Sequence, residues 1–201
     1  ICPPLITENL EIAVPNYFLG KWLSEQITIK NKISALYEFK TISSHTESLL
    51  TNFFPGIDMG LWNFESIKWG IIDSLEELNS FKESFPLRNW INKYLDNEKT
   101  IDGDLYNLIK KIANNFINYL IFRPEMIAEW NRCEINSLNL FKNLNSDQLW
   151  QPILYKLLEK KISEKPSCLY MIEVIKNLRK SQDFQSKIPK QIYIISDNNL
   201  S

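Results

Sequence analysis

Two short apolar runs, one near each end of the chain, enclose a long stretch with helical periodicity. The first run, residues 10–15, ends in Pro15, and the second covers residues 191–195. Short apolar runs bounded by proline or polar residues are typical of strands that are buried on both faces of a parallel sheet. Residues 33–42 alternate loosely between apolar and polar side chains and predict a further strand. We therefore expect 10–15 and 190–196 to lie side by side in one parallel sheet.

Apolar residues between these runs recur at spacings of three and four, which places them on one face of a helix. Residues 60–180 are therefore expected to be mostly helical. In the first helix, Phe18, Trp22 and Leu23 are predicted to form the stripe that faces the core. The expected fold class is α/β and predominantly helical, with a parallel-sheet base and a helical insertion. The predicted helices are 17–27, 44–54, 63–79, 86–95, 104–122, a short helix ending at Trp130, 147–162 and 168–180.

Arg123 and Pro124 interrupt the helical pattern of residues 116–130. Proline has no backbone N–H, and its ring disfavours helical geometry at the residue before it. One helix must therefore end at Arg123, and a second, short helix follows it to Trp130. This corner predicts that the Arg123 guanidinium projects from a helix end, where a cation is favoured. The alternative is that Arg123 is a solvated arginine at the helix corner with a structural role alone.

Six residues around this corner match a known pattern: Phe116, Tyr119, Leu120, Arg123, Pro124 and Trp130. The segment thereby resembles the gamma chain of bacterial exonuclease V (RecC), the non-catalytic subunit of the RecBCD helicase–nuclease. That family reads roughly Phe-Asp-x-Tyr-Leu-x-Tyr-Arg-Pro-x-Trp-Leu-x-x-Trp. Further similar positions, in the right order, are Val14, Trp22 and Leu23, then Trp150-Gln151 with Leu154 and Tyr155. The resemblance covers nearly the whole chain, but only the N-terminal part of a much larger family protein.

The chain departs from the family pattern at several places. The last strand continues as Ile-Ile-Ser-Asp-Asn-Asn-Leu, where the family has Gly-Ile-Ser-x-Leu-Pro-Pro, and residues 43–47 replace an aromatic stretch. Glu173 falls near a family arginine, and its carboxylate would repel a phosphate.

The resemblance implies a helicase-like architecture and a role in handling DNA. Residues 1–58 plus 183–201 would form part of an inactivated helicase-like α/β subdomain (1A), and residues 59–182 a helical subdomain (1B). The implied partners are the beta and alpha chains of the same complex (RecB-like and RecD-like) and single-stranded or end-containing DNA. The implied setting is double-strand break repair and homologous recombination in the bacterial cytoplasm.

The resemblance also implies which residues meet DNA. In the family, the first strand–helix turn and the helix before Arg-Pro line a channel that receives the unwound 3′-ended strand, where a recombination hotspot is read. Transferred by position, the channel residues are Pro15, Tyr17, Lys21, Asn114, Asn115 and Arg123, with Asn16 in the same turn. Of these, Arg123 alone keeps the family's side chain. Tyr17 can stack on a base and Lys21 can meet a phosphate, both ordinary single-strand contacts.

The sequence shows no pattern for catalysis or for a cofactor. A phosphate-binding loop reads Gly-x-x-x-x-Gly-Lys-Ser/Thr after a strand. The segment after Val14 offers only Gly20-Lys21, with Trp22 where the hydroxyl should stand. A single histidine and the absence of Cys-x-x-Cys argue against a zinc site. We therefore expect no catalytic site and no cofactor in this chain, with ATP and magnesium bound only by partner subunits.

The net charge of −1 argues against a free-standing nucleic-acid-binding domain, because such domains are usually basic. The objection weakens if this chain forms one wall of a channel that other domains complete. No apolar run approaches the roughly 18 residues that a membrane span needs. Three widely separated cysteines, Cys2, Cys133 and Cys168, favour reduced thiols in a cytosolic protein.

Two alternatives remain open. A scaffold that mainly contacts partner subunits would show an uncharged apolar patch, whereas a DNA-binding wall would show a groove lined by Tyr17, Lys21 and Arg123. An unrelated helical adaptor with chance matches is the other alternative. It fails if 10–15 and 190–196 are neighbouring parallel strands.

Overall fold

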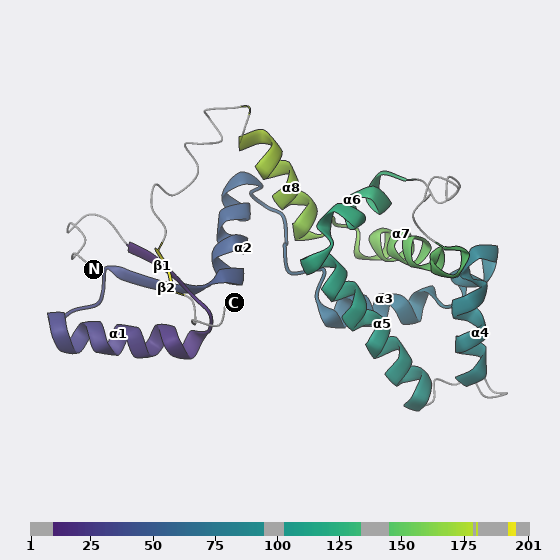
Figure 1. The fold of residues 1–201 in the computed structure, drawn as a ribbon, viewed down its shortest axis with the longest axis horizontal. Helices are drawn as coiled ribbons and strands as arrows, with labels where there is room; N and C mark the ends of the chain where they lie inside the picture. The colour runs from purple at the N-terminus through teal and green to yellow at the C-terminus, as the bar shows by residue number, and fades with distance from the viewer. Residues whose placement is uncertain (1–9, 95–102, 134–144, 179, 181–192, 196–201) are drawn as a thin grey trace. The chain divides into compact units, whose positions relative to one another are not determined.

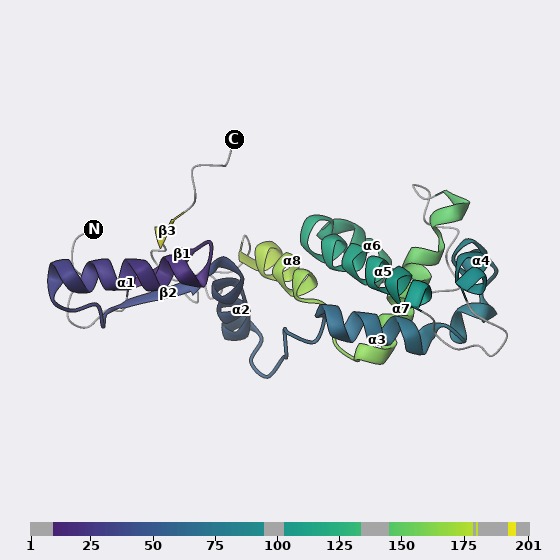
Figure 2. The same ribbon diagram turned by 90° about the horizontal axis from the view of Figure 1, so that it is seen from below.

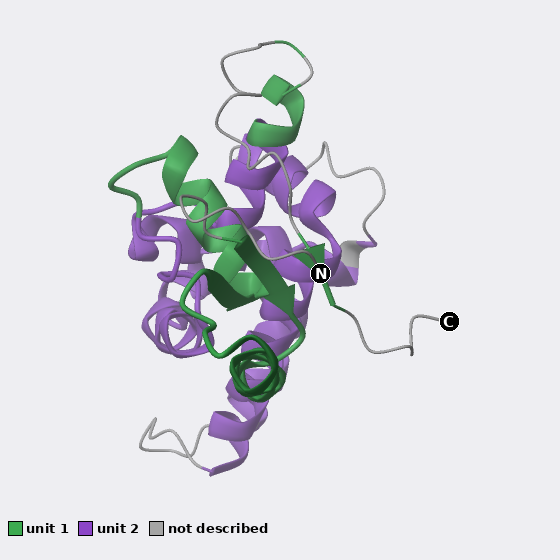
Figure 3. Cartoon of the chain, turned by 90° about the vertical axis from the view of Figure 1, so that its left-hand side faces the viewer, with its two compact units in different colours: residues 1–57, 174–201 green, residues 58–173 purple. Residues whose placement is uncertain are grey.

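The computed structural model describes residues 10–94, 103–133, 145–178, 180 and 193–195. Figure 3 shows its two compact units in different colours. Unit 1 comprises residues 1–57 and 174–201, and unit 2 comprises residues 58–173. The assignment of 1–58 plus 183–201 and of 59–182 to helicase-like and helical subdomains stays a prediction.

Within its described residues, unit 1 contains a parallel sheet of three strands in the order β2-β1-β3. The strands are β1 (Leu10–Val14), β2 (Tyr37–Thr41) and β3 (Tyr193–Ile194). Ile12 pairs with Tyr193 and Ala13 with Ile194, and the N–H of Ile195 donates to the carbonyl of Ala13 at 2.9 Å. The predicted parallel pairing of the two terminal runs is therefore confirmed. The same pairing excludes the unrelated helical adaptor.

β1 is the buried strand of this sheet. Ile12, Ala13 and Val14 are 1%, 3% and 1% exposed, as the first apolar run predicts. Ile194 of β3 is 67% exposed, so the prediction that the second run is buried on both faces is wrong. The reason is its place at the edge of the described sheet. β3 pairs with β1 on one side, and an edge strand has fewer neighbours to cover its side chains.

Helix α1 (Tyr17–Asn31) connects β1 to β2 and packs on one face of the sheet (Figure 1). Gly20 makes this contact with its backbone, since a Cβ added there would lie 3.0 Å from Phe39 Cβ and 3.3 Å from Val14 Cγ2. The contact turns Phe18 and Trp22 outward, to 81% and 54% exposure. Their predicted place in the core is therefore wrong. The helix lies so close to the sheet that its smallest residue, rather than its largest, fits between them.

Helix α2 (Ile42–Phe53) follows β2 and meets the opposite face of the sheet. Side chains alternate between the faces of a strand, so Glu11 and Lys40 point away from the face that α1 covers. There His45 Nδ1 of α2 lies 3.1 Å from Glu11 Oε2, and Lys40 Nζ lies 3.4 Å from Glu11 Oε1 and 3.0 Å from Glu38 Oε1. Burial lowers the pKa of Lys40, but the Glu38 and Glu11 carboxylates outweigh it and raise that pKa above its usual value. The His45–Glu11 contact joins α2 to β1, and the Lys40–Glu11 pair joins β1 to β2.

Unit 2 is mostly helical, which confirms the prediction for residues 60–180. Its α-helices are α3 (Phe64–Ser74), α4 (Phe85–Tyr94), α5 (Gly103–Phe122), α6 (Pro124–Arg132), α7 (Trp150–Ile162) and α8 (Ser167–Leu178), the last of which ends in unit 1. Short 3₁₀ helices are η1 (Glu77–Ser80), η2 (Lys82–Ser84) and η4 (Ser146–Gln148). The helix predicted at 63–79 is shorter in the structure, because α3 ends at Ser74. There the Ser74 hydroxyl donates to the Gly70 carbonyl at 2.7 Å.

One hydrophobic core holds the helices of unit 2 together, with α3 packed against both α5 and α7 (Figure 2). Ile109 and Phe116 of α5 are both 0% exposed, on the face that the sequence predicts for 104–122. Gly70 of α3 lies directly against α7, since a Cβ added to it would lie 2.7 Å from Leu158 Cδ2. This core fixes the C-terminal end of α5, which leads into Arg123.

Candidate nucleic-acid interface

The turn between β1 and α1 consists of Pro15 and Asn16. The Asn16 side chain accepts a hydrogen bond from the N–H of Leu19 at 2.9 Å, which satisfies one of the free amides at the start of α1. Asn16 therefore has a structural role as the helix cap, and its contact with DNA stays a prediction. The turn lies at the carboxyl ends of β1 and β2, the edge at which open parallel α/β sheets bind ligands.

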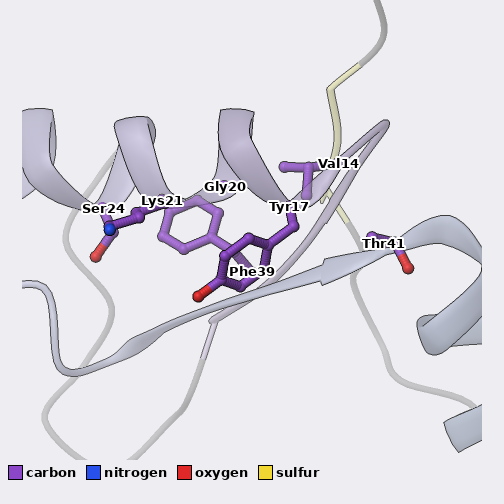
Figure 4. Close-up of a pocket in the computed structure, with 7 residues that line it drawn as sticks. All are labelled: Val14, Tyr17, Gly20, Lys21, Ser24, Phe39 and Thr41. Atoms are coloured by element: carbon purple, nitrogen blue, oxygen red, sulfur yellow. The ribbon is translucent and has the colours of Figure 1, made fainter.

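An open pocket of about 260 Å³ lies between α1 and β2 (Figure 4). It is lined by Val14, Tyr17, Gly20, Lys21, Ser24, Phe39 and Thr41. Figure 4 shows the Tyr17 ring extending into this space from α1 and the Phe39 side chain entering it from β2. The predicted residues Tyr17 and Lys21 both line this pocket, because residues four apart lie on one face of a helix. No sequence pattern marked Ser24, Phe39 or Thr41 as site residues. Thr41 could have been found from the pairing of β1 with β2, because it is the last residue of β2 and pairs with Val14.

The pocket offers a ligand an aromatic face and a cation. Tyr17 is 72% exposed, so its ring is accessible for stacking. Lys21 is exposed and forms no ion pair with any residue that the structure describes, unlike Lys40 on the other face of the sheet. An ammonium and an accessible ring in one pocket suit a nucleotide, because the ammonium can meet the phosphate and the ring can stack on the base.

Arg123 occupies the corner between α5 and α6 in unit 2. α5 ends at Phe122 and α6 begins at Pro124, so Arg123 alone connects the two helices. Its φ of −136° and ψ of 47° lie outside the helical region, as the following proline predicts. The N–H of Arg123 donates to the Tyr119 carbonyl at 2.9 Å, and its own carbonyl accepts from the N–H of Ile127 at 3.2 Å. The corner is therefore fixed by backbone hydrogen bonds on both sides.

The Arg123 side chain is exposed, as predicted. Across the described ranges, no carboxylate forms an ion pair with its guanidinium. The free carbonyls at the end of α5 favour a cation at this place. Arg123 is therefore available to a ligand rather than held in a buried carboxylate pair. Lys21 belongs to unit 1 and Arg123 to unit 2, and their predicted common groove stays a prediction.

A family profile described as "RecC, N-terminal domain" matches residues 3–201. The chain belongs to this RecC family. The RecBCD enzyme subunit RecC of Escherichia coli (strain K12) is 26% identical over 148 residues, which are 73% of this chain and 12% of that protein. The RecBCD enzyme subunit RecC of Haemophilus influenzae (strain ATCC 51907 / DSM 11121 / KW20 / Rd) is 26% identical over 170 residues, which are 77% of this chain and 15% of that protein. The chain thus spans a small part of the length of these curated relatives.

The aromatic residues of the RecC pattern pack together beneath the corner at Arg123. Phe116 and Trp130 are 0% and 1% exposed. The Trp130 ring centroid lies 5.9 Å from that of Tyr119, at 88°, and 6.0 Å from that of Tyr155, which are favourable aromatic arrangements. Burial raises the pKa of Tyr155 far above its usual value, and its hydroxyl lies 3.2 Å from Asn131 Oδ1. The aromatic members of the pattern thus support the fold, while Arg123 is left accessible.

Asn114 and Asn115 have exposed side chains on α5, away from the face that Ile112 and Phe116 bury. At about 1.5 Å of rise per residue, they lie roughly 12–14 Å along the helix from Arg123. Their amides can donate and accept hydrogen bonds. Their contact with DNA stays a prediction.

Among the residues that the structure describes, no helix is long and apolar enough to cross a membrane. The same residues contain no group of three or more histidine, cysteine, aspartate or glutamate side chains that could hold a metal ion.

Proposed function

We propose that this chain forms one wall of the channel for unwound single-stranded DNA in a RecBCD-type helicase–nuclease. In this proposal the complex acts in double-strand break repair and homologous recombination in the bacterial cytoplasm. The observation that carries the proposal is the pocket that the exposed residues Tyr17 and Lys21 both line. It lies at the ligand-binding edge of a parallel sheet, in a chain of the RecC family.

The proposed contacts follow from the chemistry of these side chains. Tyr17 stacks on a base, Lys21 meets a phosphate, and Arg123 pairs with a phosphate or stacks on a base at its corner. With a net charge of −1, the chain by itself has no excess positive charge to hold a polyanion. The other walls of the channel, and the beta and alpha chains (RecB-like and RecD-like), supply the remaining contacts.

In this proposal the chain itself catalyses no reaction. A phosphate-binding loop wraps the phosphates with a glycine-rich segment between strand and helix. Here that segment is the two residues Pro15 and Asn16, and Gly20 and Lys21 lie inside α1. Gly20 is also packed against Phe39, so its backbone is not free to cradle an anion. ATP and magnesium are therefore assigned to the partner subunits.

The test is photocrosslinking of a single strand in the complete complex, assembled with the subunit that carries this chain. A strand with 4-thiothymidine at successive positions is unwound and irradiated. We expect crosslinks within residues 1–201, reduced several-fold by Tyr17→Ala and by Lys21→Ala without loss of assembly. Trp90→Ala is the control, because Trp90 is an exposed aromatic residue of α4 that does not line the pocket. Crosslinking that neither pocket variant reduces contradicts the proposal.

A protein-interaction scaffold with no direct DNA contact is the second candidate. The exposure of Phe18 and Trp22 favours it, since exposed aromatic residues are enriched in protein interfaces. This candidate predicts unchanged strand crosslinking in Tyr17→Ala and Lys21→Ala, with weaker subunit assembly on Trp22→Ala.

A further inference from the structure

Helix α1 carries an exposed apolar stripe on the side away from the sheet. The stripe consists of Phe18, Trp22, Glu25 and Ile29, at spacings of four, three and four, which place all four on one face of a helix. Phe18, Trp22 and Ile29 are 81%, 54% and 69% exposed. Figure 1 shows β1 and β2 along one side of α1, with no described element of unit 1 along the other. This outer stripe therefore lacks a partner within the described part of unit 1.

The outer stripe borders the pocket face of the same helix and differs from it in chemistry. Tyr17, Lys21 and Ser24 line the pocket. The stripe residues Phe18, Trp22 and Glu25 each come directly after one of these. Successive residues of a helix are rotated by about 100° around its axis. Helix α1 thus presents two adjacent surfaces with different chemistry. The Tyr17 and Phe18 rings lie edge to face, with their centroids 6.3 Å apart, so the two surfaces adjoin at the N-terminal end of α1.

The chemistry of the stripe suits a protein partner rather than a nucleic acid. It carries no cation, and its one charged residue, Glu25, is a carboxylate that repels phosphates. Ile29 has no ring on which a base can stack. An aromatic and aliphatic face about three turns long is the kind of surface that a helix presents to an apolar groove or to another helix.

We propose that the outer stripe of α1 docks a later segment of the same RecC-type polypeptide. The matched residues are 12% and 15% of the two relatives, so 88% and 85% of their lengths lie outside the match. A segment in the same polypeptide is present at a high effective concentration, which favours it over a second copy or a separate subunit. The docked segment buries Phe18, Trp22 and Ile29 and presents apolar side chains to them. This inference goes beyond the proposed function, because it assigns a face that does not contact the strand.

Site-specific photocrosslinking in the full-length protein, assembled in its complex, tests the inference. p-Benzoylphenylalanine replaces Trp22 or Ile29, two stripe residues that do not line the pocket, and in the control it replaces Lys30, an exposed α1 residue off the stripe. Exposed positions accept the probe without disturbing the core. We expect positions 22 and 29 to form crosslinks within the same polypeptide, to residues beyond 201, at several-fold higher yield than position 30. Crosslinks to a second copy, to a different subunit or to the DNA strand overturn the proposal, as does equal yield at all three positions.

A second variant separates this inference from the proposed function. Trp22→Lys places a charge in the stripe and leaves the pocket residues intact. With the probe at position 29, we expect Trp22→Lys to reduce the intramolecular crosslink several-fold while strand crosslinking at the pocket is unchanged. An undiminished intramolecular crosslink overturns the docking proposal. Strand crosslinking that is absent even with an intact stripe contradicts the proposed function instead.

Discussion

Gly20 and Phe39 are in such close contact that a Cβ added to Gly20 would lie 3.0 Å from Phe39 Cβ. This is the point at which α1 meets β2. The contact decides which face of α1 turns toward the sheet, and hence which residues line the pocket and which form the outer stripe.

Enlarging Gly20 should separate α1 from the sheet. We expect Gly20→Leu to lower the free energy of unfolding by about 1–3 kcal/mol, because the branched side chain has no room against Phe39 and Val14. Gly103→Ala is the matched control, since a Cβ there meets nothing within 4 Å at the start of α5. Urea unfolding followed by circular dichroism gives both values. Equal midpoints for Gly20→Leu and the unchanged chain would contradict the packing described for α1.

Arg123→Ala should affect DNA without affecting the fold. The side chain is exposed and unpaired among the described residues, so we expect a change in stability within about 0.5 kcal/mol. In the complete complex we expect weaker strand engagement, with partial recovery in Arg123→Lys, which keeps the charge but loses the planar group. Arg132→Ala, an exposed arginine in the last turn of α6, is the control. Unfolding of Arg123→Ala without a DNA defect would assign the arginine a structural role.

Binding of single strands should depend on salt through Lys21. Each lysine–phosphate contact releases counterions and contributes about 0.7 to the slope of log K against log salt for a single strand. We expect Lys21→Ala to reduce that slope by about this amount, and Tyr17→Ala to weaken binding by about 1–3 kcal/mol with little change in slope. Fluorescence anisotropy of a labelled strand on the complete complex measures both. Lys30→Ala, outside the pocket, should leave both quantities unchanged, and an equal effect of all three variants would argue against a defined site.

Unit 2 should lose stability in alkali. Burial raises the pKa of the Cys168 thiol to about 11, and burial together with the Glu164 hydrogen bond raises the pKa of Tyr170 to about 12. Unfolding lets both groups ionise at their usual, lower pKa values, so their contribution to stability is complete below about pH 8.5 and is lost progressively as pH rises toward 11–12. For Cys168 the loss is at most about 3 kcal/mol.

Chemical unfolding at a series of pH values measures this loss. Cys168→Ala should flatten the decline between pH 8.5 and 11, and Tyr170→Phe should flatten it between pH 10 and 12. A decline of unchanged steepness in both variants would show that other groups cause it.

The chain should not hydrolyse ATP or cut DNA. The two-residue turn before α1 cannot wrap phosphates, and Lys21 lies inside the helix. We expect no magnesium-dependent phosphate release and no nuclease activity from the purified chain. Magnesium-dependent turnover that disappears in Lys21→Ala would refute this prediction.

For the candidate site, the sequence indicated Tyr17, Lys21 and Arg123, and the structure finds all three exposed. The corner at Arg123 follows from Pro124 alone, because the constraint that proline puts on the preceding residue is local. The pocket does not follow from a local rule. It needs Phe39 and Thr41 of β2 beside α1, and these contacts exist only once β1 and β2 have paired.

The sequence by itself determined the helices and strands to within a few residues, because their apolar spacing and their proline boundaries are local properties. Burial agreed with the apolar pattern in β1 and α5, but tertiary structure decided it in α1 and β3. Trp22 is exposed because Gly20 takes the place against the sheet, and Ile194 is exposed because β3 lies at an edge. Lys68 is 5% exposed although it is charged, because Glu65 Oε2 at 2.6 Å and Tyr106 Oη at 3.2 Å satisfy its ammonium group. Burial at these positions depends on which other segments pack against the residue, and the spacing of apolar residues within one element does not contain that information.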